Sequence, residues 1–141
     1  MEPNIWGPGA WTFLHSITFQ YPETPSDIEK QKYYVFFNSL KTVLPCPICR
    51  GHYESNLETL PIRLDTRQDL IEWLIDVHNE VNRMNNKKIY SYNEVYEIYN
   101  EMYDNNPKNQ SGKVDYFYIL FIIGICIIGY YYYQNYYLKK K

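Results

Sequence analysis

The chain has 141 residues, of which 45% are hydrophobic, so it is long enough for one ordinary domain with a buried core. Its formal net charge is −2 and its pI is near 5.9, which excludes the basic surface that nucleic-acid binding requires. The three cysteines, Cys46, Cys49 and Cys126, are too few for a disulfide-stapled secreted scaffold. We therefore expect one domain that has no nucleic-acid partner.

The first two predicted helices lie between residues 6 and 44. Pro8 suits an early helical position, and Tyr21-Pro22 ends the first helix. Ser26 and Glu29 form a capping box that starts the second helix, which extends to Leu44-Pro45. In the first helix, residues recur at three- and four-residue spacing: Trp11, Leu14, His15 and Thr18. The second helix carries the apolar residues Ile28, Val35, Phe36, Leu40 and Val43.

Three more helices are predicted up to residue 104. The third begins at the cysteine pair and ends near Leu60-Pro61. Thr66 with Asp69 starts the fourth, and Ser91 with Glu94 starts a shorter fifth. One face of the fourth carries Ile71, Leu74, His78, Val81 and Asn85, and the fifth carries Val95, Ile98 and Met102. No alternating pattern indicates a strand, so we expect an all-α four-helix bundle with a short fifth helix, at residues 1–104.

The C-terminal part has a different composition. Residues 105–115, rich in Asn, Gly and charge, are expected to be a linker. Residues 116–133 carry no charge and are long enough to span a bilayer, with tyrosines at both ends and a short basic tail at residues 134–141. The alternative is a buried core helix, which would not need the tyrosines or the terminal lysines. We expect a single-pass C-terminal transmembrane helix, in a host or virion membrane if the chain is viral.

The orientation of this helix stays open. The lysine triplet Lys139–Lys141 favours a cytosolic C-terminus by the positive-inside tendency, whereas a tail-anchored chain would place the same lysines across the membrane. Asn109-Gln110-Ser111 is a glycosylation sequon that could be used only if the linker is lumenal.

The pair Cys46-Pro47-Ile48-Cys49 is the strongest local signal for chemistry. At a helix N-terminus, the free backbone amides and the helix dipole favour the thiolate, which is the reactive form. The alternatives are a zinc site completed by His52 and His78, and two cysteines without a role. A dithiol alone only exchanges disulfides, so net oxidation requires an electron acceptor such as a flavin.

Three motifs in this order resemble those of the Erv/ALR family of flavin-linked sulfhydryl oxidases, and most closely the compact forms of large nucleocytoplasmic DNA viruses. They are Trp11-x-x-Leu14-His15 with Tyr21-Pro22, then Pro45-Cys46-x-x-Cys49 with His52, then His78-Asn79-x-Val81-Asn82 with Lys87. The resemblance covers roughly Trp6 to Met102. Cys-x-x-Cys followed by His-Asn-x-Val-Asn is a specific combination, whereas either motif alone is a modest signal.

The resemblance implies a bundle that binds FAD non-covalently, usually as a homodimer. It implies that Cys49 is the thiol next to the flavin and that Cys46 meets the substrate. Electrons would pass from the dithiol to FAD and then to dioxygen, giving hydrogen peroxide. The residues that match FAD-contacting positions are Gly7, Trp11, His15, His52, His78, Asn79, Asn82 and Lys87. Such a protein contains no catalytic metal.

The chain departs from many members of the family in its other cysteines. It has no second pair to carry electrons from the substrate, and Cys126 is single and lies in the expected membrane segment. We therefore expect protein dithiol substrates, such as a thioredoxin-like partner, to reach Cys46 directly. A zinc-binding interaction module and a flavin-free thiol–disulfide carrier are the competing functions.

Overall fold

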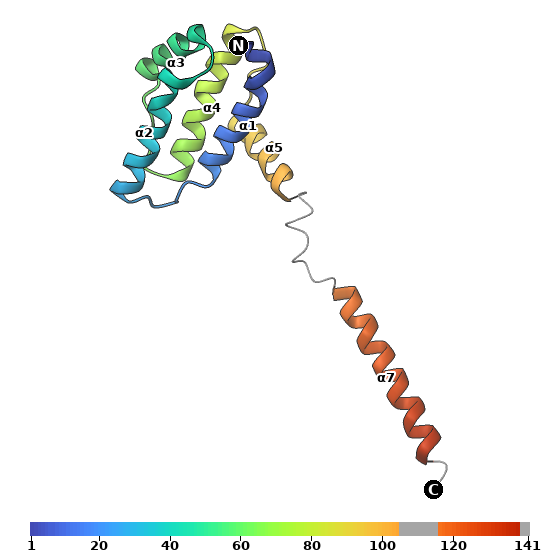
Figure 1. Cartoon of the computed structure of the whole chain (residues 1–141). Helices are drawn as coiled ribbons and strands as arrows, with labels where there is room; N and C mark the ends of the chain where they lie inside the picture. The colour runs from blue at the N-terminus through green and yellow to red at the C-terminus, as the bar shows by residue number, and fades with distance from the viewer. Residues whose placement is uncertain (105–115, 139–141) are drawn as a thin grey trace. The chain divides into compact units, whose positions relative to one another are not determined.

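The computed structural model describes residues 1–104 and 116–138, and every regular element in these two ranges is an α-helix (Figure 1). The chain divides into two compact units, Met1–Tyr99 and Asn100–Lys141. The predicted linker at residues 105–115, its sequon and the lysine triplet lie outside the described residues.

The first unit is the predicted helical bundle. Its helices are α1 (Pro3–Phe19), α2 (Asp27–Val43), α3 (Pro47–Thr59), α4 (Arg67–Met84) and the greater part of α5 (Tyr92–Asp104). Helix α1 packs against α4, and α2 packs against α3. Figure 1 shows the start of α1, all of α3 and the end of α4 at the same end of the bundle. The first turns of α1, the Cys46–Cys49 pair and the last turns of α4 therefore lie at that end, whereas Trp11 and His15 lie further along α1.

Side-chain caps begin three of these helices where the sequence predicts them. At α2, the Ser26 backbone N–H donates to Glu29 Oε2 at 2.8 Å, and the Glu29 N–H donates back to Ser26 Oγ at 3.4 Å. The same exchange between Ser91 and Glu94 begins α5. Thr66 caps α4. Each cap satisfies backbone amides that the helix leaves free, and typically stabilises the fold by about 1 kcal/mol.

The core of the bundle forms around two aromatic side chains. Phe37 on α2 is fully buried and packs edge-to-face against Trp73 on α4, with ring centroids 5.1 Å apart. The Trp73 indole N–H donates to the Leu60 carbonyl at 2.9 Å, so this buried polar group is satisfied. Other core residues are Leu14, Tyr21, Leu40, Tyr53, Leu70, Leu74 and Val77.

The buried face of α2 differs from the expected one. Leu40 is buried and Phe36 packs against the core, but Ile28, Val35 and Val43 are 69%, 56% and 64% exposed. The stripe that faces the core instead runs through Tyr33, Phe36, Phe37, Leu40 and Leu44. On α5, Val95 is buried as expected, whereas Ile98 and Met102 are 44% and 46% exposed and Tyr99 is buried.

The second unit contains α7 (Tyr116–Leu138). Residues Tyr118–Tyr136 are long and apolar enough to cross a membrane, and none of that window is buried inside the molecule. The alternative of a buried core helix therefore has no support. The helix continues five residues beyond the expected end of the span at Tyr133 and includes the first part of the predicted basic tail.

Candidate functional site

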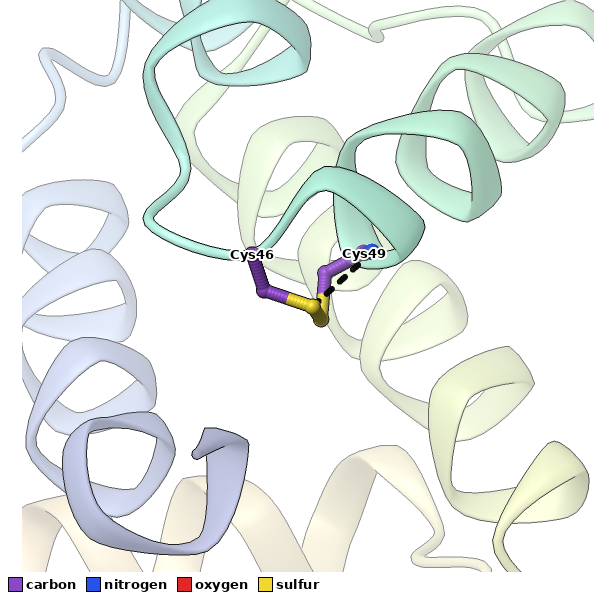
Figure 2. Close-up of a disulfide and its surroundings, with 2 residues drawn as sticks. All are labelled: Cys46 and Cys49. Atoms are coloured by element: carbon purple, nitrogen blue, oxygen red, sulfur yellow. Dashed lines mark hydrogen bonds between the residues drawn. A yellow bond between two sulfur atoms is a disulfide. The ribbon is translucent and has the colours of Figure 1, made fainter. Parts of the chain in front are cut away.

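The dithiol lies at the N-terminus of α3, as the sequence predicts. Cys46 is the N-cap residue, and its Sγ accepts a hydrogen bond from the Cys49 backbone N–H at 3.2 Å. The two side chains form a disulfide across a Cα–Cα distance of 5.1 Å (Figure 2). The positive end of the helix dipole favours negative charge at this position, so reduction of the disulfide yields thiolates in a favourable field.

Arg50 fixes the turn that carries this disulfide. Its Nη1 donates to the Thr42 carbonyl in the last turn of α2 at 3.3 Å, while its own backbone N–H donates to the Cys46 carbonyl at 3.0 Å. The connection between α2 and α3 is thus held at both ends. Arg50 is not among the site residues predicted from the sequence, although a cation directly after Cys49 is a visible signal.

The exposure of the two cysteines does not support the roles that the family resemblance gives them. Cys46 is 9% exposed and Cys49 is half-buried. In the bundle itself, the thiol that the resemblance assigns to the substrate is therefore the more covered one. The division of roles between them rests on the family pattern.

Three aromatic residues from α1 and α4 form one cluster. The rings of Trp11 and His78 are stacked, with centroids 3.8 Å apart and planes 6° from parallel. His15 Nε2 lies 3.1 Å from His78 Nδ1. One of these nitrogens therefore carries a hydrogen and donates a hydrogen bond to the other. The sequence motifs therefore meet in space, although they lie more than sixty residues apart along the chain.

Both histidines of this cluster are held neutral. Burial and, to a smaller extent, the neighbouring His78 together lower the pKa of His15 to about 3. Burial, followed by the positive charge of Lys87, lowers the pKa of His78 to about 4. At neutral pH, both rings can therefore donate and accept hydrogen bonds without bringing a charge into the site.

Helix α1 also holds buried polar atoms that lack a partner. Trp6 Nε1 and His15 Nδ1 are shielded from solvent and make no hydrogen bond to the described residues. A buried group of this kind typically costs about 1–3 kcal/mol unless a ligand completes it. At Gly7, a Cβ atom would meet nothing within 4 Å, so the backbone is open to close approach. These features fit a ligand with polar edges and aromatic planes, which is the chemistry of FAD.

The last turns of α4 carry Asn79 and Asn82, and Lys87 follows in the loop after the helix. Asn79 Nδ2 donates to the Tyr90 carbonyl at 2.8 Å, and Asn79 Oδ1 accepts from the Tyr90 N–H at 3.0 Å. This side chain therefore already has two partners in the loop after α4. Asn82 is buried, with 6% exposure, and its carbonyl accepts from the Lys87 N–H at 2.8 Å. Asn86, at φ 51°, makes the turn that brings this about.

His52 stands apart from the histidine pair. It is exposed on α3 and is not part of the cluster of Trp11, His15 and His78. Within residues 1–104 and 116–138, no group of three or more His, Cys, Asp or Glu side chains could hold a metal ion. The proposed zinc site of Cys46, Cys49, His52 and His78 therefore has no support, since His78 contacts Trp11 and His15 instead.

Comparisons with known proteins show which family this bundle represents. Residues 8–104 match the Erv1 / Alr family. The chain belongs to that family. A probable FAD-linked sulfhydryl oxidase of Acanthamoeba polyphaga mimivirus is 42% identical over 100 residues, which cover 69% of this chain and 70% of the relative. A FAD-linked sulfhydryl oxidase of African swine fever virus is 34% identical over 111 residues, covering 79% and 92%.

The solved structures give the same result for the fold. The FAD binding domain of Erv1 from Saccharomyces cerevisiae aligns with a TM-score of 0.64 at 29% sequence identity, over 66% of this chain and 89% of that domain. The all-α architecture expected from the sequence is thus the Erv1 / Alr fold. The aligned portion is close in length to the bundle, and the family match ends where α5 ends.

Proposed function

We propose that the chain is a FAD-linked sulfhydryl oxidase, which converts protein dithiols to disulfides and dioxygen to hydrogen peroxide. The observation that carries this proposal is the Cys46–Cys49 disulfide at the start of α3, in a member of the Erv1 / Alr family. The relatives named above are FAD-linked sulfhydryl oxidases by name, and their similarity extends over most of this chain.

The thiol chemistry follows from the disulfide. A substrate thiolate attacks Cys46 Sγ, forms a mixed disulfide and releases Cys49 as a thiolate. The second substrate thiol, once deprotonated, attacks the mixed disulfide at the substrate sulfur, so the substrate leaves oxidised and Cys46 leaves as a thiolate. The N-terminus of α3 stabilises the negative charge that each step produces.

The cofactor would be held by residues of α1, α3 and α4 and of the loop after α4. Trp11, His15 and His78 form its aromatic and hydrogen-bonding wall, and Gly7 allows the α1 backbone to come close. Lys87 supplies a cation that suits a pyrophosphate. When bound, FAD accepts two electrons from the dithiol and delivers them to dioxygen. The complete set is Gly7, Trp11, His15, His52, His78, Asn79, Asn82 and Lys87.

The decisive experiment replaces one thiol. Purified in detergent, the full chain should be yellow, release FAD on denaturation and produce peroxide from a dithiol. Cys49→Ser should stay yellow but lose peroxide production, because electrons can no longer leave the dithiol. Cys126→Ser, which changes the free cysteine on α7, is the matched control and should keep full turnover. A colourless wild-type protein would indicate the flavin-free carrier instead, and turnover by Cys49→Ser would refute the assignment.

The partners follow from the surface of each unit. Protein dithiols, including thioredoxin-like proteins, would be the substrates. The exposed apolar side chains of Phe13 on α1 and Val35 on α2 support a homodimer. The apolar helix α7 supports a single-pass membrane anchor at the C-terminal end, with residues 1–104 as the catalytic domain and 105–115 as the linker.

A further inference from the structure

Exposed apolar side chains flank the disulfide along the chain. Val43 is 64% exposed and Ile48 is 71% exposed, and Pro45 and Pro47 are exposed as well. These four residues are called the dithiol rim below. Between Thr42 and Cys49, no side chain other than the two cysteines is ionisable, although 21% of the whole chain is charged. The rim is therefore an uncharged apolar surface beside the reactive bond.

The nearest charges along the chain already have partners within the fold. Lys41 Nζ forms an ion pair with Glu54 Oε1 at 3.7 Å, and Arg50 donates to the Thr42 carbonyl. Leu44 packs against the core, but its neighbour Val43 does not. The fold thus leaves most of the Val43 and Ile48 side chains exposed and available to a second molecule.

We propose that the dithiol rim binds the substrate and selects cysteine-containing segments whose neighbouring side chains are apolar and uncharged. This inference rests on the proposed function. A substrate thiolate that attacks the Cys46–Cys49 disulfide forms one new S–S bond and releases one thiolate. Across a disulfide, the two Cα atoms are only about 4.4–6.8 Å apart. The side chains next to the substrate cysteine must therefore lie against Pro45, Pro47 and Ile48.

The two prolines further define how the substrate binds. Proline has no backbone N–H, so the rim cannot donate backbone hydrogen bonds at positions 45 and 47 to an extended peptide. Recognition by strand pairing is thereby weakened at the positions closest to Cys46. Packing of apolar side chains against Val43 and Ile48 remains as the source of selectivity, and it favours substrates that bury apolar surface there.

The test compares two synthetic peptides that each carry a reduced cysteine pair, with leucines beside the cysteines in one and serines in the other. The FAD-loaded full chain in detergent is assayed by oxygen consumption, and the readout is the ratio of kcat/KM for the two peptides. The wild type should prefer the leucine peptide by about tenfold, the discrimination typical of one apolar contact. Ile48→Ser should reduce this ratio to about twofold. Because the ratio compares two peptides in the same protein, a substitution that slows the reaction with both peptides equally leaves the ratio unchanged.

Ile28→Ser is the matched control. Ile28 is 69% exposed and has the same chemistry as Ile48, but it lies at the start of α2, roughly 22 Å of helix away from Val43. It should keep the wild-type ratio. An equal loss of preference in Ile28→Ser would overturn the proposal, because it would indicate non-specific adsorption of the leucine peptide.

Activity on dithiothreitol separates this inference from the proposed function, and sedimentation tests whether the rim contacts a second copy. A wild-type protein that oxidises dithiothreitol but shows equal kcat/KM for both peptides refutes the dithiol rim and leaves the oxidase intact. A wild-type protein that oxidises neither peptide nor dithiothreitol refutes the oxidase, and the rim with it. If Ile48→Ser changes the oligomeric state in sedimentation, the rim is a contact with a second copy of the chain, and the proposal is wrong.

Discussion

The neutral pair of His15 and His78 predicts that the apoprotein becomes less stable as the pH falls below neutrality. Burial holds the pKa of His15 at about 3 and that of His78 at about 4, whereas both rise to 6.5 in the unfolded chain. Below pH 6.5, the unfolded state therefore binds protons that the folded state does not. The stability contributed by the neutral rings is fully present above pH 6.5 and is lost as the pH falls toward the folded values.

The size of this effect follows from the shifts. Each pH unit inside the window changes the free energy of unfolding by about 1.4 kcal/mol per histidine. At pH 5.0, about 1.5 units below the unfolded pKa, His15 should therefore contribute a loss of about 2 kcal/mol. His78 is only half-buried and partly screened by solvent, so its share is taken as about 1 kcal/mol. The expected total is about 3 kcal/mol, a large fraction of the roughly 5–15 kcal/mol typical of a folded domain.

The assay is urea denaturation of the FAD-free full chain in detergent, at several pH values between 7.5 and 5.0, followed by tryptophan fluorescence. The carboxylates of Glu29, Asp65 and Glu94, whose pKa values are lowered by hydrogen bonds, titrate below this range. His15→Gln should remove about 2 kcal/mol of the loss between pH 7.0 and 5.0. Any constant effect of the substitution cancels, because only the change with pH is compared.

The chain has three histidines, which provides an internal control. His52 is exposed on α3 and makes no contact with the pair, so His52→Gln should keep the full pH dependence. Equal stability of the wild type at pH 7.0 and 5.0 would contradict the reasoning. So would a His15→Gln protein with an unchanged slope, since the buried ring would then not be the group that resists protonation.

Two further substitutions test contacts that hold the bundle in place. Asn79→Ala removes both hydrogen bonds to Tyr90 and should lower the free energy of unfolding by about 2 kcal/mol, measured by urea denaturation at pH 7.5; a loss below about 0.5 kcal/mol would show that the loop is held by other contacts. Tyr53→Phe removes the buried bond from its hydroxyl to the Phe37 carbonyl at 3.0 Å and should cost about 1 kcal/mol in the same measurement. An unchanged midpoint would mean that this hydroxyl contributes nothing to stability.

The helices could be predicted from the sequence because their limits are encoded locally. A Ser or Thr followed three residues later by an acidic residue supplies a cap wherever it occurs, and Pro22, Pro45 and Pro61 stop or redirect the chain without help from distant residues. The starts of α2, α4 and α5 were therefore correct to the residue. The same holds for α3, since the N-cap position of Cys46 depends only on its neighbours.

The buried face of a helix depends on what packs against it, and here local reasoning failed. Val35 and Phe36-Phe37 offer two overlapping apolar stripes on α2, and the sequence alone does not choose between them. Trp73 makes the choice, because the edge-to-face contact with Phe37 fills the core between α2 and α4. Val35 is then left exposed, where it becomes available for assembly.

In the candidate site as well, the sequence predicted which residues come together but not which partners each residue contacts. The order of the motifs predicted that His15 and His78 belong to one site. In the structure, His15 lies within hydrogen-bonding distance of His78, and Trp11 stacks on the His78 ring. Motif order could not show that His78 and Asn79, adjacent in one motif, face different partners. On a helix, adjacent positions point about 100° apart, so His78 meets α1 while Asn79 meets the loop at Tyr90.

Asn79 and Asn82 both hold the loop that follows α4. Asn79 fixes Tyr90 at the far end of that loop, and the Asn82 carbonyl fixes Lys87 at the near end, with Asn86 in the left-handed turn between Asn82 and Lys87. Held in this way, Lys87 lies close enough for its charge to lower the pKa of His78. A cation and a neutral imidazole are thereby placed at the same end of α4, which suits an anionic cofactor that also needs uncharged hydrogen-bonding partners. Asn79 therefore helps to hold the loop that carries Lys87.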